Sequence, residues 1–199
     1  MRFAVAAAAG RTHRKFALAL LATALTADAA AGTVKEASIT FAHNAYQYQF
    51  SVEVDAPIEA VRDVVTDYDH LERINNYVIR SEVLERYDER RLRRRLWLNY
   101  CVLVFCFDLY FVEDVEEFED GAITTTVVPE ESNFRRGYSN WRIESISATT
   151  TRISVEAEHE PEFWIPPVIG PLVFKRSFRK EVRETAINIE REANRAMRE

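Results

Sequence analysis

Glycine, cysteine and histidine are scarce in this 199-residue sequence, which contains five, two and four of them. No two glycines lie close together, so the chain has no Gly-rich loop of the kind that cradles phosphate groups. Histidines occur at His13, His43, His70 and His159, without the spacing of metal ligands. Nucleophile-elbow and kinase signatures are also missing. We therefore expect no metal site and no cofactor, and we assign no catalytic residue.

The chain also lacks an apolar segment that would span a bilayer comfortably. Phe16–Leu25 is apolar but too short, and it follows an acid-free stretch with four basic residues. Two small-x-small cleavage sites come next, ending at Ala29 and Ala31. This order predicts a secretory signal peptide over residues 1–31, cleaved near Ala29 or Ala31, and export to a periplasm. Without a twin-arginine pair, general secretion is the expected route, and an uncleaved N-terminal anchor is the alternative.

The segment Arg91–Glu116 is expected to form a β-hairpin in which Cys101 lies opposite Cys106. This register brings opposite charges and apolar partners together on both faces, as cross-strand pairing favours. The opposed pairs are Trp97–Tyr110, Asn99–Asp108, Arg93–Asp114, Arg91–Glu116, Leu98–Leu109, Leu96–Phe111, Leu92–Val115 and Arg94–Glu113. Sliding the register by two residues sets a leucine against Glu113, so the alternatives are worse.

The mature domain is acidic. Residues 1–31 carry four Lys or Arg and one Asp, so their removal changes the formal net charge from −6 to −9. An acidic domain argues against nucleic acid as a partner, because phosphate binding needs a positive face. The arginine-rich run 90–95 resembles such a face, but three of its arginines oppose acids in the hairpin. We therefore expect no nucleic-acid partner.

The only two cysteines, Cys101 and Cys106, lie near the end of the hairpin. In an oxidising compartment we predict that they form a disulfide, with two buried free thiols as the alternative. The turn between them has no residue that favours turns. Its residues are Val102, Leu103, Val104 and Phe105. This apolar tip is either buried under the segment 166–172 or contacts a membrane surface or a partner protein.

The remaining sequence predicts an α+β domain over residues 46–199, preceded by a linker or weak strand over 32–45. Apolar alternation and turn signals predict these elements: a strand at 46–54, two short helices after Pro57, strands at 77–87, 123–128, 138–146 and 152–159, and a helix at 171–197. The only element large enough to cover the sheet is the last helix. We expect a strongly curved antiparallel sheet of about seven strands wrapped around it. Such a wrap leaves space inside, with a mouth near the short helices and the segment 161–171.

The segment Val54–Leu71, which reads VDAPIEAVRDVVTDYDHL, resembles the opening of START-like helix-grip proteins. These include coenzyme Q-binding proteins and polyketide cyclase/dehydratase-like proteins, in which a strand ends in Ala-Pro and a helix carries the Val…Asp-Tyr run. The resemblance covers Tyr46–Met197. It implies a cavity for an apolar small molecule such as a lipid, a quinone or an isoprenoid- or polyketide-like ligand, possible lipid transfer or presentation, and no shared catalytic motif. The alternatives are a cyclase/dehydratase-like enzyme and a partner-binding module that uses the hairpin tip.

Candidate ligand-contacting residues follow from the expected inward faces and the mouth. They are Tyr48, Phe50, Leu96, Leu98, Phe111 and Trp141 inside, and Phe163, Trp164, Phe174 and Phe178 near the entrance. Arg94 and Glu113 share the apolar hairpin face, where they either anchor a polar head group or, as we favour, lie solvated near the sheet edge. His159 is expected at the surface, with a role as acid or base at the cavity mouth as the alternative.

Overall fold

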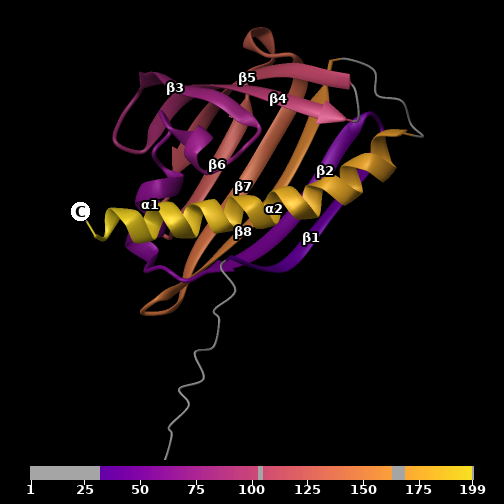
Figure 1. The fold of residues 1–199 in the computed structure, drawn as a ribbon. Helices are drawn as coiled ribbons and strands as arrows, with labels where there is room; N and C mark the ends of the chain where they lie inside the picture. The colour runs from indigo at the N-terminus through magenta and orange to yellow at the C-terminus, as the bar shows by residue number, and fades with distance from the viewer. Residues whose placement is uncertain (1–31, 103–104, 163–168, 199) are drawn as a thin grey trace, which may run out of the picture.

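A long helix, α2, crosses the concave side of a single antiparallel sheet (Figure 1). The computed structural model describes residues 32–102, 105–162 and 169–198. Within them the sheet has eight strands in the order β1-β2-β8-β7-β6-β5-β4-β3. The strands are β1 Thr33–Ala42, β2 Ala45–Val54, β3 Val78–Arg86, β4 Arg91–Val102, β5 Phe105–Glu117, β6 Ala122–Val127, β7 Phe134–Ser147 and β8 Thr150–Pro161. The helices are α1 Ile58–Val65 and α2 Ile169–Ala196, with 3-10 turns η1 Leu71–Arg73 and η2 Pro129–Glu131.

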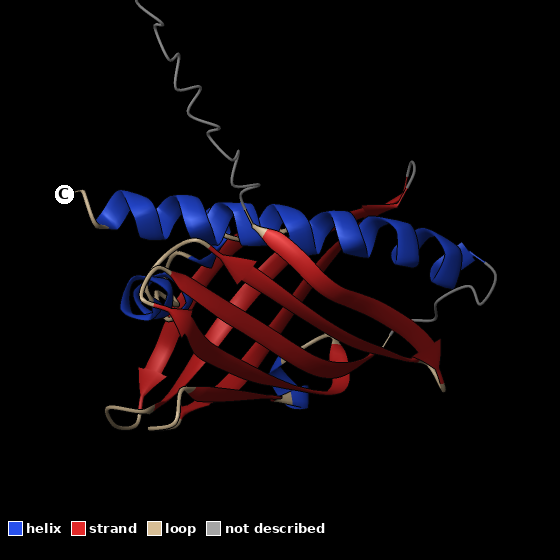
Figure 2. Cartoon of the chain, turned by 90° about the horizontal axis from the view of Figure 1, so that it is seen from below, coloured by secondary structure: helices blue, strands red, loops and turns tan. Residues whose placement is uncertain are grey.

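The strands curve beneath α2, as the view along the sheet shows (Figure 2). One stripe of α2 is buried, formed by Val182, Ala186, Ile189 and Ala193 at helical spacing. This stripe belongs to the same core as the inward residues of β2 and β8. The expected α+β helix-grip architecture is confirmed. Among the described residues, no helix combines the length and apolar character needed to cross a membrane.

The segment expected as a linker or weak strand is β1, a ten-residue edge strand. It pairs with β2 through a tight turn in which His43 and Asn44 both have positive φ, 53° and 64°. That turn geometry matches the twist of antiparallel strands. Ala37 and Ile39 pack against the core from this strand, which gives the sheet eight strands rather than about seven.

The observed pairing of β4 with β5 confirms the predicted hairpin register, with Cys101 opposite Cys106. This places the cysteines as a cross-strand disulfide requires, and the bond itself stays a prediction. Pairing continues to Val102 and Phe105, so the connection is shorter than the expected four-residue turn. Arg91 lies opposite Glu116 as predicted, and its side chain binds Asp88, 2.8 Å away, in the preceding turn.

Candidate functional site

An apolar cavity of about 100 Å³ lies between α2 and the concave face of the sheet. Its walls come from the end of α1, η1, the loop before β3, strands β3, β4, β6 and β7, and α2. The lining residues are Val65, Tyr68, Leu71, Ile74, Asn75, Val78, Arg94, Leu96, Ile123, Thr125, Trp141 and Thr185. Three predicted ligand-contacting residues, Arg94, Leu96 and Trp141, are among them. The short helices flank this cavity, as the sequence predicted.

Arg94 and Glu113 form a buried ion pair beside the cavity. Arg94 donates from Nη2 and Nε to Glu113 Oε2, at 2.7 and 3.0 Å, and the two residues are 8% and 2% exposed. Thr125 donates its hydroxyl to Glu113 Oε1 at 2.8 Å. The expectation of a solvated pair near the sheet edge is wrong, because the Tyr68 ring lies 5.1 Å from the guanidinium and covers it.

The charges of this pair balance each other. Burial by itself would raise the pKa of Glu113, but the charge and hydrogen bonds of Arg94, together with His159, outweigh it and lower the pKa to about 2. Arginine stays protonated in proteins. The pair therefore brings a positive and a negative group into the interior with no net charge of its own.

His159 is buried on the inward face of β8 rather than exposed at a strand end, which corrects the sequence expectation. Its ring stacks on Tyr48, with centroids 5.8 Å apart, and also contacts Phe111 and Phe134. Nε2 lies 3.9 Å from Glu113 Oε1, beyond hydrogen-bond distance. It is the only buried side-chain nitrogen or oxygen without a hydrogen-bond partner in the described part of the chain.

The position of His159 depends on a glycine on the neighbouring strand. Gly137 on β7 lies directly opposite His159, and a Cβ at this position would be 2.5 Å from His159 Cδ2. The missing side chain leaves the room that the imidazole occupies. The sequence of β8 indicated that His159 points inward, because His159 continues the alternation of the inward-facing residues Ile153, Val155 and Ala157.

A hydrogen-bond chain links the ion pair to the cavity wall. Thr125 and Ser139 join their hydroxyls at 2.8 Å, and Trp141 donates its indole N–H to Ser139 at 2.9 Å. Thr125 and Ser139 were not among the predicted site residues. The available signal was a small polar residue at an inward position of β6 and of β7.

Glu181 faces the interior from α2. Burial raises its pKa to about 7, against the effect of a hydrogen bond from Asn75, and Glu184 adds to the rise. The pKa of Tyr48 is raised by burial, then by the charges of Glu113 and Glu181. A carboxyl group that exchanges its proton near neutral pH thus faces the same interior as the ion pair.

The other predicted residues divide into two groups. Tyr48 and Phe50 meet the buried Phe178 at ring distances of 5.5 and 6.3 Å, and Phe50 lies 6.2 Å from Trp141. Leu98 and Phe111 also pack against the core. Outside the described residues lie Phe163, Trp164, Leu103 and Val104 and the side chains of Cys101, Val102, Phe105 and Phe174.

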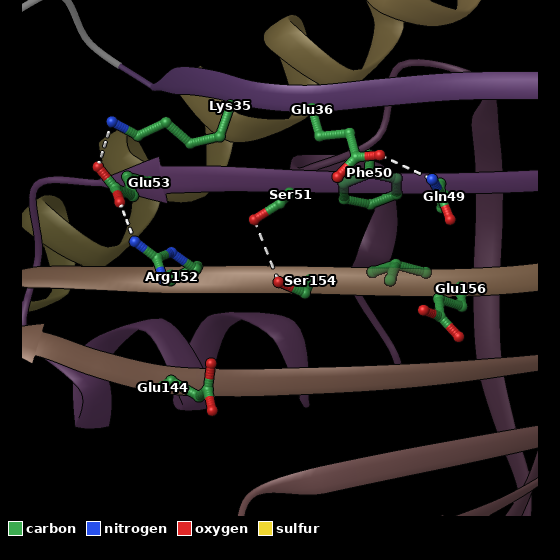
Figure 3. Close-up of a pocket in the computed structure, with 11 residues that line it drawn as sticks. Lys35, Glu36, Gln49, Phe50, Ser51, Glu53, Glu144, Arg152, Ser154 and Glu156 are labelled. Atoms are coloured by element: carbon green, nitrogen blue, oxygen red, sulfur yellow. Dashed lines mark hydrogen bonds and ion pairs between the residues drawn. The ribbon is translucent and has the colours of Figure 1, made fainter.

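A larger hollow of about 570 Å³ lies on the opposite, outer face of β1, β2, β8 and β7 (Figure 3). Glu53 is central to it and binds Lys35 at 2.7 Å and Arg152 at 2.6 Å. Its other lining residues are mostly polar and open to solvent. The inner cavity is therefore the better site for an apolar molecule. No group of three metal-ligating side chains occurs among the described residues.

Residues 54–184 match the family described as polyketide cyclase / dehydrase and lipid transport. Solved structures with the same fold include a START superfamily protein from Mycobacterium smegmatis, at 16% identity over 75% of this chain and 98% of the other, with a TM-score of 0.59. The Zhui aromatase/cyclase from Streptomyces sp. R1128 is 15% identical over 77% and 94%, with a TM-score of 0.54. Human StAR-related lipid transfer protein 5 is 16% identical over 81% and 88%, with a TM-score of 0.53. No functionally curated protein matches the sequence.

Proposed function

The chain belongs to the polyketide cyclase / dehydrase and lipid transport family, and we propose that it is an exported protein that holds an apolar small molecule between its sheet and α2. The observation that carries this proposal is the apolar cavity on the concave face, with one buried ion pair at its wall. Apolar walls with a few placed polar groups are typical of small-molecule sites. Lipids, quinones and polyketide- or isoprenoid-like molecules suit such a site, and lipid transfer or presentation would use it.

The ion pair suits a ligand with a neutral polar end. Arg94 and Glu113 cancel each other's charge, so an anionic head group would find no free cation in this wall. Arg94 and Thr125 line the cavity itself, and the indole of Trp141 lies beside them. A hydroxyl or carbonyl group is thus preferred over a carboxylate or phosphate.

Binding would require the cavity to widen. About 100 Å³ is below the ~300–1,000 Å³ of typical ligand sites. One cavity wall is the loop after η1, which is held to α2 by polar contacts: Asn188 donates to Ile74 O at 3.3 Å, and Asn76 donates to Glu184 Oε2 at 3.2 Å. We propose that the ligand enters by separating this loop from α2. Amide hydrogen exchange would then slow in the loop and in α2 when ligand binds.

Mass spectrometry of an organic extract of the purified mature protein tests the proposal. We expect an apolar molecule to co-purify, and a panel of phospholipids, quinones and polyketide-like compounds to contain a binder. Thr185→Trp should abolish binding by filling the cavity from α2, whereas the exposed Lys180→Trp on the same helix should not. An empty protein that binds nothing in the panel would contradict the proposal.

A second candidate function is a cyclase- or dehydratase-like enzyme acting in the same space. The supporting observation is that the His159 imidazole and the Glu113 carboxylate are buried together, with Nε2 3.9 Å from Oε1. Such a pair suits proton transfer in general acid–base catalysis. If the extracted ligand is chemically changed by the wild-type protein and bound unchanged by His159→Gln, the enzyme is favoured. Unchanged ligand with both proteins favours a carrier.

A further inference from the structure

Gly32, the residue before β1, is buried against the backbone of α2. Its backbone nitrogen donates to Glu190 Oε2 at 2.9 Å. A Cβ on Gly32 would lie 2.7 Å from Ile187 N and 2.8 Å from the carbonyl carbon of Ala186, closer than real contacts allow. The backbone here also has a φ of +59°, which favours glycine. The site therefore accepts a residue without a side chain and positions its nitrogen on a carboxylate.

The Glu190 carboxylate contacts backbone N–H groups and has no cationic partner in the part of the chain that the structure describes. The same oxygen, Oε2, accepts a second hydrogen bond from Asp55 N, also at 2.9 Å, so Glu190 joins the start of β1 to the end of β2. Within the described residues no lysine, arginine or histidine pairs with it; the neighbouring Glu192, by contrast, binds Arg191 and Arg195. A charged nitrogen at the position of Gly32 N would complete this site.

The sequence offers a way to create that charge. Ala29-Ala30-Ala31 ends directly before Gly32 and has the small-x-small pattern of a signal-peptide cleavage site. We propose that the signal peptide is removed between Ala31 and Gly32 and that the new α-ammonium of Gly32 binds Glu190 in this site. A signal peptidase of the exporting cell would hydrolyse the bond: water adds across it, leaving a carboxylate on Ala31 and an ammonium group on Gly32.

Cleavage at this bond would give the site a charge that cleavage at the other candidate bond would not. Cleavage after Ala29 leaves two alanines ahead of Gly32, whose nitrogen then stays an uncharged amide with one hydrogen. Cleavage before Gly32 gives the same nitrogen a positive charge, and a charge-assisted hydrogen bond is roughly twice as strong as a neutral one. The α-ammonium would thus strengthen the contact of α2 with β1 and β2 only after export, so that the mature protein is more stable than its precursor.

The first test is the N-terminus of the protein expressed with its own leader in an exporting host. Intact mass and N-terminal sequencing should show a chain that starts at Gly32. A chain that starts at Ala30, or that keeps its leader, would overturn the proposal.

The second test compares the thermal unfolding of chains that start at Gly32 and at Ala30. The Gly32 start should have the higher Tm at pH 7, by about 2–4 °C. Glu190→Gln should remove this difference, because the carboxylate is lost, whereas Glu192→Gln on the same helix should preserve it. Equal Tm values for the two starts, or a difference that survives Glu190→Gln, would refute the ion pair. Ligand binding plays no part in either test, so the proposed function is judged separately.

Discussion

Removing one member of the buried ion pair should cost far more stability than removing both. Glu113→Leu leaves the Arg94 guanidinium about nine-tenths buried beneath Tyr68 with both of its hydrogen bonds to Glu113 lost. An uncompensated buried charge costs about 3–5 kcal/mol, a large share of the ~5–15 kcal/mol by which domains are stable. Arginine cannot escape this cost by losing its proton.

The reciprocal change has a different pH dependence. In Arg94→Met the orphan carboxyl can take up a proton, so the cost falls when the solution is acidified. We expect Arg94→Met to be milder at pH 5 than at pH 8, and the cost of Glu113→Leu to be nearly constant over that range. The double variant should lie within about 1–2 kcal/mol of wild type, because Thr125 keeps its hydrogen bond to Ser139 and the new side chains are apolar.

Urea unfolding followed by circular dichroism at pH 5 and pH 8 measures these differences. The double-mutant cycle isolates the coupling between the two residues. Wild type should also lose stability as the pH falls from about 4.5 to about 2, because the pKa of Glu113 is lowered in the folded state and its contribution is present only above that window. Single variants that each cost below about 1 kcal/mol, or a double variant that loses the sum of both, would refute the buried pair.

Three further predictions address other parts of the interior. Glu181→Gln should stabilise the protein by about 2 kcal/mol at pH 8 and have little effect at pH 4. The reason is that the pKa of Glu181 is raised in the folded state, so ionising this carboxyl at high pH destabilises the fold. The same urea assay measures the difference, and an equal effect at both pH values would contradict the raised pKa as its cause. Gly137→Ala should destabilise by about 1–3 kcal/mol and shift the NMR signals of the His159 ring, since the added Cβ collides with it; an unshifted ring would argue against the contact. Export should yield a Cys101–Cys106 disulfide, seen as two thiols that react with an alkylating reagent only after reduction; thiols that react before reduction would show that the bond is absent.

Local patterns predicted most of the fold because each depends on neighbouring residues. The β4–β5 register follows from which charges and apolar groups can face one another, and a slip would bury Glu113 against leucine. The stripe on α2 follows from helical spacing. The edge strand β1 was less clear, because its pairing is decided by β2 and by the helix that it contacts.

The sequence by itself determined which residues of each strand face inward, the register of the hairpin and the family resemblance that implies a ligand cavity. It did not determine which polar groups would be buried, because burial depends on side chains from distant parts of the chain that pack over them. Tyr68 covers Arg94 after the chain turns at η1, and sheet curvature brings His159 of β8 to Glu113 of β5. Glu190 reaches Gly32 across 158 positions, a contact that only the docking of α2 on the sheet could create.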